Sequence, residues 1–170
     1  MQMKKFRPTI PISEWKIATH LEATGSIQNQ SGLPAYACSC KWCSLWKSSF
    51  KNILPSWFAS ELKRILVDIP NPADLYRFET NGKYSSIRIV YFIVGKIQSG
   101  PNAWSEGDSG NTLMYRTIQE KPYISLAVYS ATHYYGDVPI LNDNKAGELI
   151  CLDMRLMVNN EFQHAHLTNA

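Results

Sequence analysis

The chain has 170 residues, of which 45% are hydrophobic and 18% are charged, and its formal net charge is +3. This length favours one domain with a core of ordinary size, and the hydrophobic fraction excludes a wholly disordered chain. The small charge excludes the heavily basic arm of many capsid and histone-like proteins. No apolar run approaches the ~18 residues of a membrane span, and no secretory signal is visible. We therefore expect a soluble intracellular protein without a transmembrane segment.

The first half of the chain carries one strand signal and one helix signal. Alternating apolar and polar residues predict a strand over Trp15–Glu22. The polar residues 28–36 are typical of a loop, and Cys38–Leu54 is predicted to be irregular. Apolar residues at helical spacing predict a helix over Trp57–Leu66. Pro70 and Pro72 are expected to end it.

The second half of the chain has the character of an antiparallel sheet. Tyr84–Val94 is rich in β-branched and aromatic residues and predicts a central, covered strand. A loop is expected over Gln98–Asn111, followed by strands over Thr112–Gln119 and Tyr123–Thr132. Glu148–Val158 alternates most regularly, with its even-numbered apolar residues on one face.

This order of elements predicts the α+β class, with an antiparallel β-sheet packed against one main α-helix. Strands and helices do not alternate along the chain, which argues against a parallel sheet. We expect a short basic arm over residues 1–12, a single domain over 13–158 and a flexible tail over 159–170.

Three of the four cysteines are clustered as Cys38-x-Cys40-x-x-Cys43. Zinc usually takes four thiolate or imidazole ligands, and the paired Cys-x-x-Cys pattern typical of zinc sites is missing. Candidates for a fourth ligand are Cys151, His20 and His133. We therefore expect three reduced thiols and neither metal nor cofactor, with zinc binding or nucleic-acid binding at this cluster as the alternative.

The tetrapeptide Gly107–Gly110, with Ser109 as its nucleophile, resembles the motif of chymotrypsin-like serine proteases. His20, Asp68 and Ser109 occur in the same chain order as the His, Asp and Ser of that family. Against this reading, only 19 residues precede His20, and a predicted helix lies where barrel strands should be. A protease is the second alternative.

Two further features could make contact with a surface. Trp104 lies in a polar loop, where it is either an exposed anchor for a membrane or partner or a ring folded back over the sheet. Lys4, Lys5 and Arg7 form the densest basic group.

A second basic group is interleaved with aromatic residues, as in proteins that bind single-stranded nucleic acid. Its members are Lys41, Lys47 and Lys51 beside Trp42, Trp46 and Phe50. The competing interpretation packs the rings against the neighbouring helix and leaves the lysines in solvent. A phosphate-binding loop, a dinucleotide-binding glycine motif and a His-Glu-x-x-His motif are all missing, so we do not expect an enzyme.

The order and size of these elements resemble the matrix proteins of rhabdoviruses, particularly the compact plant-virus kind. The matching parts are Trp15–Glu22, Trp57–Leu66, Ile87–Val94, the loop holding Trp104, and Glu148–Val158. The chain departs from the animal-virus members in having a short arm and no Pro-Pro-x-Tyr budding motif.

The resemblance implies a non-enzymatic viral structural protein that self-associates and bridges the nucleocapsid and an anionic membrane surface. It implies a location in the virion and in the host cytoplasm at the membrane. It assigns the contact with membrane or partner to Trp104, Lys4, Lys5 and Arg7.

Overall fold

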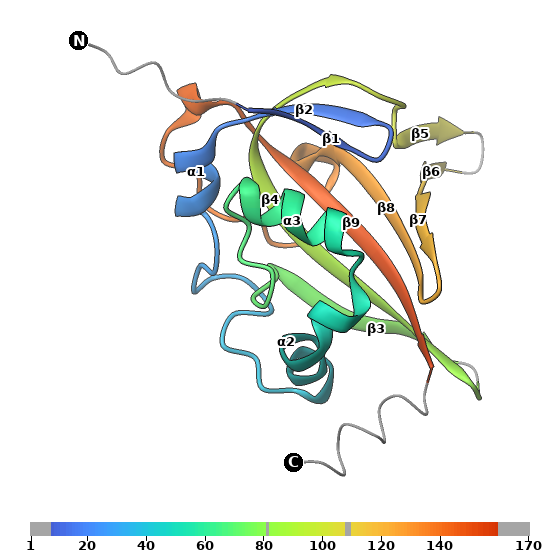
Figure 1. Cartoon of the computed structure of the whole chain (residues 1–170). Coiled ribbons are helices and arrows are strands. Elements are labelled where there is room, and N and C mark those ends of the chain that lie inside the picture. Colours follow the sequence, from blue (N-terminus) through green and yellow to red (C-terminus); the bar gives the residue numbers. More distant parts are fainter. Residues whose placement is uncertain (1–7, 81, 108–109, 160–170) are drawn as a thin grey trace.

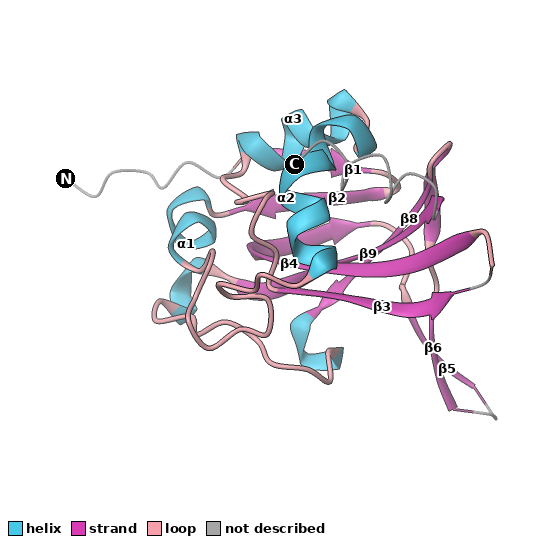
Figure 2. Cartoon of the chain, turned by 90° about the horizontal axis from the view of Figure 1, so that it is seen from below, coloured by secondary structure: helices cyan, strands magenta, loops and turns pink. Residues whose placement is uncertain are grey.

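A computed structural model of the chain describes residues 8–80, 82–107 and 110–159, and shows a seven-stranded antiparallel sheet with few helices (Figure 1). Six strands follow one another in the order β1-β2-β4-β9-β8-β7, and β3 pairs with β4 off this path. The strands are β1 (Thr9–Ile12), β2 (Trp15–Thr19), β3 (Asp74–Thr80), β4 (Tyr84–Ser99), β7 (Arg116–Glu120), β8 (Tyr123–Ser130) and β9 (Glu148–Asn159). A separate two-stranded sheet joins β5 (Trp104–Gly107) and β6 (Gly110–Leu113) and projects from the main sheet in Figure 2.

Three α-helices accompany the sheet: α1 (Leu21–Ser26), α2 (Lys41–Ile53) and α3 (Ser56–Arg64). Two short 3-10 helices, η1 (Ala131–His133) and η2 (Asn144–Ala146), lie between β8 and β9. Figure 2 shows α2 and α3 along one face of the sheet. Trp46 of α2 is buried there, and its indole Nε1 donates to the carbonyl of Ile69 and to the Tyr91 hydroxyl, each at 2.9 Å. This face of the sheet and the two helices therefore enclose an apolar core.

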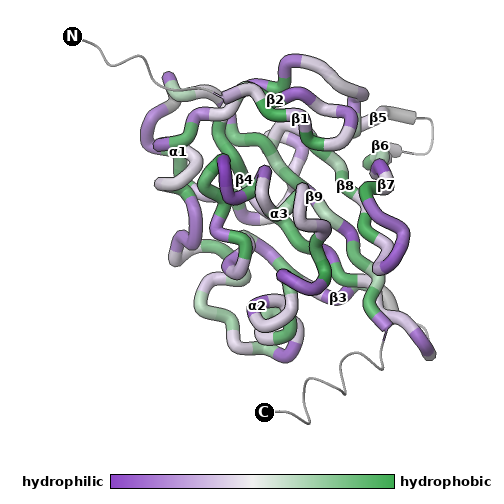
Figure 3. Tube along the Cα trace, in the orientation of Figure 1, coloured by the Kyte–Doolittle hydropathy of each residue, from purple (hydrophilic) through white to green (hydrophobic). Residues whose placement is uncertain are grey.

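The long pairing of β4 with β9 sets the two faces of the sheet. Ile89 lies opposite Met154 and Ile93 opposite Ile150, and all four side chains are buried. Figure 3 shows the hydrophobic residues as green segments along these central strands. Alternation places Asp153 and its odd-numbered neighbours in β9 on the opposite face, as the sequence predicts.

The structure confirms the antiparallel sheet, the central position of β4, the strands β8 and β9, and a helix close to the predicted Trp57–Leu66. It differs at α2, because the segment expected to be irregular is the longest of the described helices. Cys43, Trp46, Phe50 and Ile53 are its buried residues at helical spacing. The lysines and serines between them obscure this stripe in the sequence.

Several strand boundaries also differ from the sequence-based expectation. The first predicted strand ends at Thr19, since His20 caps α1 and turns the chain into a helix. The expected loop over Gln98–Asn111 contains β5, and neither β1 nor β3 is predicted. These strands are short or lie at a sheet edge, where apolar periodicity is weak.

The edge of β4 between β2 and β3 has no partner strand, and α1 satisfies its backbone groups instead. The Thr24 hydroxyl accepts from the Val94 N–H at 2.9 Å and donates to the Val94 carbonyl at 3.4 Å. The Gln28 side-chain amide donates to the Phe92 carbonyl at 3.0 Å, and the His20 N–H donates to the Val94 carbonyl at 2.8 Å. Buried backbone groups need such partners, so α1 stands in for a strand.

Gly95 of β4 lies opposite Thr19, at the end of the β2–β4 pairing. A Cβ atom on Gly95 would lie 2.0 Å from the Ala18 carbonyl oxygen. Gly147 approaches from the other side, with a φ of +138° and with its own would-be Cβ 2.7 Å from the Gly95 oxygen. Only residues without side chains allow the backbones to approach so closely.

The sheet face opposite α2 carries a buried ion pair. The Arg88 Nε donates to the Asp153 Oδ1 at 2.8 Å, and the Arg88 Nη2 also contacts the Asp153 Oδ2. The Tyr129 hydroxyl donates to the Asp153 Oδ2 at 2.6 Å. The Arg88 Nη1 donates to the hydroxyls of Tyr76 and Tyr135, at 2.7 and 2.6 Å. Both charges are therefore compensated, and both side chains are buried.

Thr24→Val should destabilise the fold by about 1–3 kcal/mol, because the buried Val94 N–H would lose its acceptor. Thr24→Ser retains the hydroxyl and should cost only about 1 kcal/mol, for the lost methyl group. Urea unfolding of the two variants and the parent protein measures the difference. Equal stability of the valine variant and the parent would show that α1 does not satisfy β4.

Arg88→Met should cost about 3–5 kcal/mol, since it leaves the Asp153 carboxylate buried and unpaired. The double variant Arg88→Met/Asp153→Leu should recover much of that loss, because it removes both charges. Urea unfolding checks both values. A single variant that is as stable as the double variant would contradict the buried charge pair.

Candidate metal centre

The three clustered cysteines lie at the junction between a loop and α2. Cys38 ends the loop, Cys40 is the N-cap of α2, and Cys43 lies in the first helical turn. The Cys40 sulfur accepts from the Cys43 N–H at 3.5 Å. The loop is held to the residue before β3 and to itself, because the Ala35 N–H donates to the Ala73 carbonyl and the Cys38 N–H donates to the Ala35 carbonyl. The helix start and the loop together fix the positions of the three thiols.

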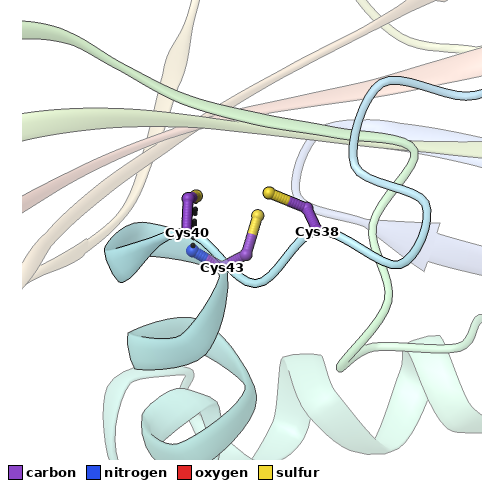
Figure 4. A group of neighbouring side chains, drawn as sticks. All are labelled: Cys38, Cys40 and Cys43. Carbon is purple, nitrogen blue, oxygen red and sulfur yellow. Dashed lines mark hydrogen bonds between the residues drawn. The ribbon is translucent and has the colours of Figure 1, made fainter.

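The three sulfur atoms all lie within 4.8 Å of one another. Figure 4 shows the Cys38 and Cys43 side chains pointing toward each other, with Cys40 beside them. All three thiols are reduced, and their burial is graded, since Cys43 is buried, Cys38 is half-buried and Cys40 is exposed. The cluster is therefore open to solvent on the Cys40 side.

The surroundings shift the pKa values of Cys40 and Cys43 in opposite directions. At Cys40 slight burial raises the pKa, but the Cys43 N–H, the thiols of Cys38 and Cys43, and the Trp42 N–H stabilise the thiolate, so the pKa is lowered overall. At Cys43, burial and the neighbouring sulfurs raise the pKa well above its usual value. Of these two thiols, Cys40 therefore loses its proton first.

Two cations lie against the ring of Trp42, in the first turn of α2. The Lys41 Nζ is 5.3 Å from the centre of the Trp42 ring, and the Arg77 guanidinium carbon is 6.0 Å from it. The first turn of α2 contains no acidic residue, and the N-terminal end of a helix favours negative charge. The start of α2 therefore favours a thiolate at its N-cap residue, Cys40.

The donor set and its spacing fit one thiolate-preferring ion. Three thiolates bound to one Zn²⁺ at ~2.3 Å in tetrahedral geometry would be about 3.8 Å apart, which needs only a small contraction of this cluster. Soft sulfur ligands select Zn²⁺, Cu⁺ or iron–sulfur groups over hard cations. Among the described residues no further His, Cys, Asp or Glu joins the group.

The three residues considered for a fourth ligand lie elsewhere in the fold. Cys151 is fully buried in β9, on the face of the sheet away from α2. His20 caps α1 and accepts from the Ala23 N–H through Nδ1 at 3.2 Å. His133 stacks on Trp104 with ring centres 5.4 Å apart. Any fourth ligand within the described chain would therefore require a rearrangement.

The residues considered for a protease triad have other partners. His20 is the cap of α1, and the Asp68 Oδ2 accepts from the Asn71 side chain at 3.0 Å. Ser109 lies outside the described residues, and the flanking glycines form the closing ends of β5 and β6. Described contacts therefore do not join His20 to Asp68.

The interleaved lysines and aromatic rings of α2 are divided between solvent and core. Trp46 and Phe50 are buried against the sheet, and Trp42 is half-buried. The lysines of the group, Lys41, Lys47 and Lys51, are exposed. This separation leaves no row of exposed rings on α2 for stacking with bases.

The expected contact residues lie in two different settings. Trp104 is half-buried, stacks on His133 and has its ring centre 6.4 Å from that of Tyr129, so it folds back over the sheet. Lys4, Lys5 and Arg7 lie outside the described residues. No described helix is both long and apolar enough to cross a bilayer. The matrix-like role stays a prediction.

Comparison with protein-family models, with curated proteins and with solved structures finds no match to the chain.

In the metal-free protein, a limiting amount of iodoacetamide near neutral pH should alkylate Cys40 first. Cys40 is exposed and its pKa is lowered, whereas Cys43 and Cys151 are buried and their pKa values are raised. Peptide mass spectrometry over a time course gives the order. Earlier labelling of Cys43 or Cys151 would contradict the arrangement.

Proposed function

We propose that this protein binds one thiolate-preferring metal ion, with Zn²⁺ as the first candidate, through Cys38, Cys40 and Cys43. One observation carries the proposal: three reduced thiols from a loop and a helix start converge within 4.8 Å. A disulfide framework would pair thiols, and a buried apolar role would not leave Cys40 exposed. This proposal takes up the alternative that the sequence left open for this cluster.

The three cysteines have different tasks in this proposal. Cys43 is buried among core residues and fixes one ligand to the helix. Cys40 is exposed and offers the sulfur that an incoming ion meets first. Cys38 closes the site from the loop, whose position depends on the bond between the Ala35 N–H and the Ala73 carbonyl at 3.1 Å. Ligands from a helix and from a tethered loop make a site that is partly formed before the ion arrives.

Three protein ligands leave one position on a tetrahedral ion unfilled. Structural zinc sites are normally closed by four protein ligands, whereas an open position is filled by water or by an exogenous ligand. The exposed side at Cys40 gives such a ligand access. The proposed site is therefore suited to reversible binding, or to an ion that is shared with a partner.

The metal content of the purified protein tests this proposal. Anaerobic titration with Zn²⁺, and separately with Cu⁺, against a chromogenic chelator should show one ion per chain. Cys40→Ser should weaken binding by more than about tenfold, at least the loss that follows removal of an outer-shell partner. Cys38→Ser should act in the same direction.

Cys151→Ser is the matched control, because this thiol lies on the far face of the sheet, away from the cluster. It should leave the metal affinity unchanged. Circular dichroism of each variant separates loss of a ligand from loss of the fold. A parent protein that retains no ion under reducing conditions, or a Cys40→Ser variant that binds as tightly as the parent, would refute the proposal.

A further inference from the structure

A pocket of about 280 Å³ lies on the sheet face opposite α2. It lies between β3, the start of β4, β8, β9 and Tyr115. The ring-bearing residues of its lining are Phe78, Tyr115 and Tyr123. Its volume is close to the lower limit of ~300 Å³ for small-molecule pockets, which favours a ligand of about one ring.

Arg155 provides the positive charge of this pocket. Its guanidinium carbon is 4.1 Å from the centre of the Tyr115 ring and 5.0 Å from that of Phe78. These contacts hold the guanidinium plane while the residue remains exposed. Within the described part of the chain, Arg155 has no carboxylate partner. A positioned guanidinium with no counter-charge is suited to receive an anion.

The neighbouring buried ion pair leaves that charge available. Arg88 lies directly opposite Arg155 in the β4–β9 register, on the same face. Asp153, which is the nearby acid in β9, is bound by Arg88 and by the Tyr129 hydroxyl. The charge of Asp153 is therefore already compensated by Arg88.

Polar donors complete the lining of the pocket. The hydroxyls of Ser86 and Ser125 belong to it, and both can donate a hydrogen bond. Phe78 is 41% exposed and Tyr123 is 39% exposed, so both rings are accessible to a ligand. Exposed rings beside a fixed cation and two hydroxyls have the mixed lining of ligand sites.

We propose that this pocket binds a small aromatic anion, in which a single ring contacts Phe78 and Tyr123 and a carboxylate or phosphate group pairs with Arg155. The anionic group would accept two parallel hydrogen bonds from the guanidinium edge, since either group matches the geometry of that fork. The site is separate from the cysteine cluster, so it does not depend on metal binding.

The test uses benzoate and phenyl phosphate as probes, with benzamide as the uncharged analogue of benzoate. Isothermal titration and protein NMR shifts should show that at least one of the anions binds at the pocket and that benzamide binds more weakly. Arg155→Gln should weaken binding of the anion by about tenfold or more, and Arg155→Lys by less, because lysine keeps the charge without the fork. Phe78→Ala should also weaken it through loss of the ring contact.

Lys47→Gln is the control for overall charge, since it removes one exposed cation from α2 on the other side of the sheet. It should leave binding unchanged, and so should Cys40→Ser. The proposal is overturned if neither anion binds, if benzamide binds as tightly as benzoate, or if Arg155→Gln and Lys47→Gln have equal effects. Binding of a single-stranded oligonucleotide while neither small anion binds would also overturn it.

Discussion

The backbone of β4 is the constraint on which the rest of this structure depends. β4 pairs along its length with β9 on one side, and on the other side it bonds in turn to β3, α1 and β2. Its middle residues are buried on both faces, so each N–H and C=O there needs a partner within the protein. Two side chains meet this need: Thr24 in the short helix α1, and Gln28 just after it.

Different interactions stabilise the two faces of the sheet. The face toward α2 and α3 is stabilised by apolar burial, with polar groups such as the Trp46 indole satisfied one by one. The opposite face carries Arg88, Asp153 and Arg155. Burying a charge is costly unless it is paired, and Arg88 and Asp153 meet this condition. Arg88 is therefore buried in an ion pair, whereas Arg155, directly opposite it in the β4–β9 register, stays exposed.

The sequence predicts those parts whose pattern is continuous. The alternation in Glu148–Val158 and the apolar run of Tyr84–Val94 identify β9 and β4, which are the two longest strands of the sheet. The sequence does not predict α2, because serines and lysines stand between the apolar residues that form its buried face. That face is recognised only once the helix is seen packed on the sheet. The cysteine spacing marks the candidate site, but convergence of the thiols depends on the loop bond to Ala73. The Arg155 pocket joins strands distant in sequence, so spacing alone cannot indicate it.

The contact of Gly95 with Gly147 has a consequence for the history of this fold. Two backbones meet there without side chains, and one of them adopts a positive φ. A larger residue at either position cannot be accommodated by a smaller side chain nearby, because the atoms that it would meet belong to the backbone. In surface loops and in the core, one substitution can be compensated by another, whereas no second substitution can compensate for a change at these two glycines. In any set of descendants or ancestors of this chain, the two glycines should be the last positions to change, and their separation should fix the alignment where other similarity has faded.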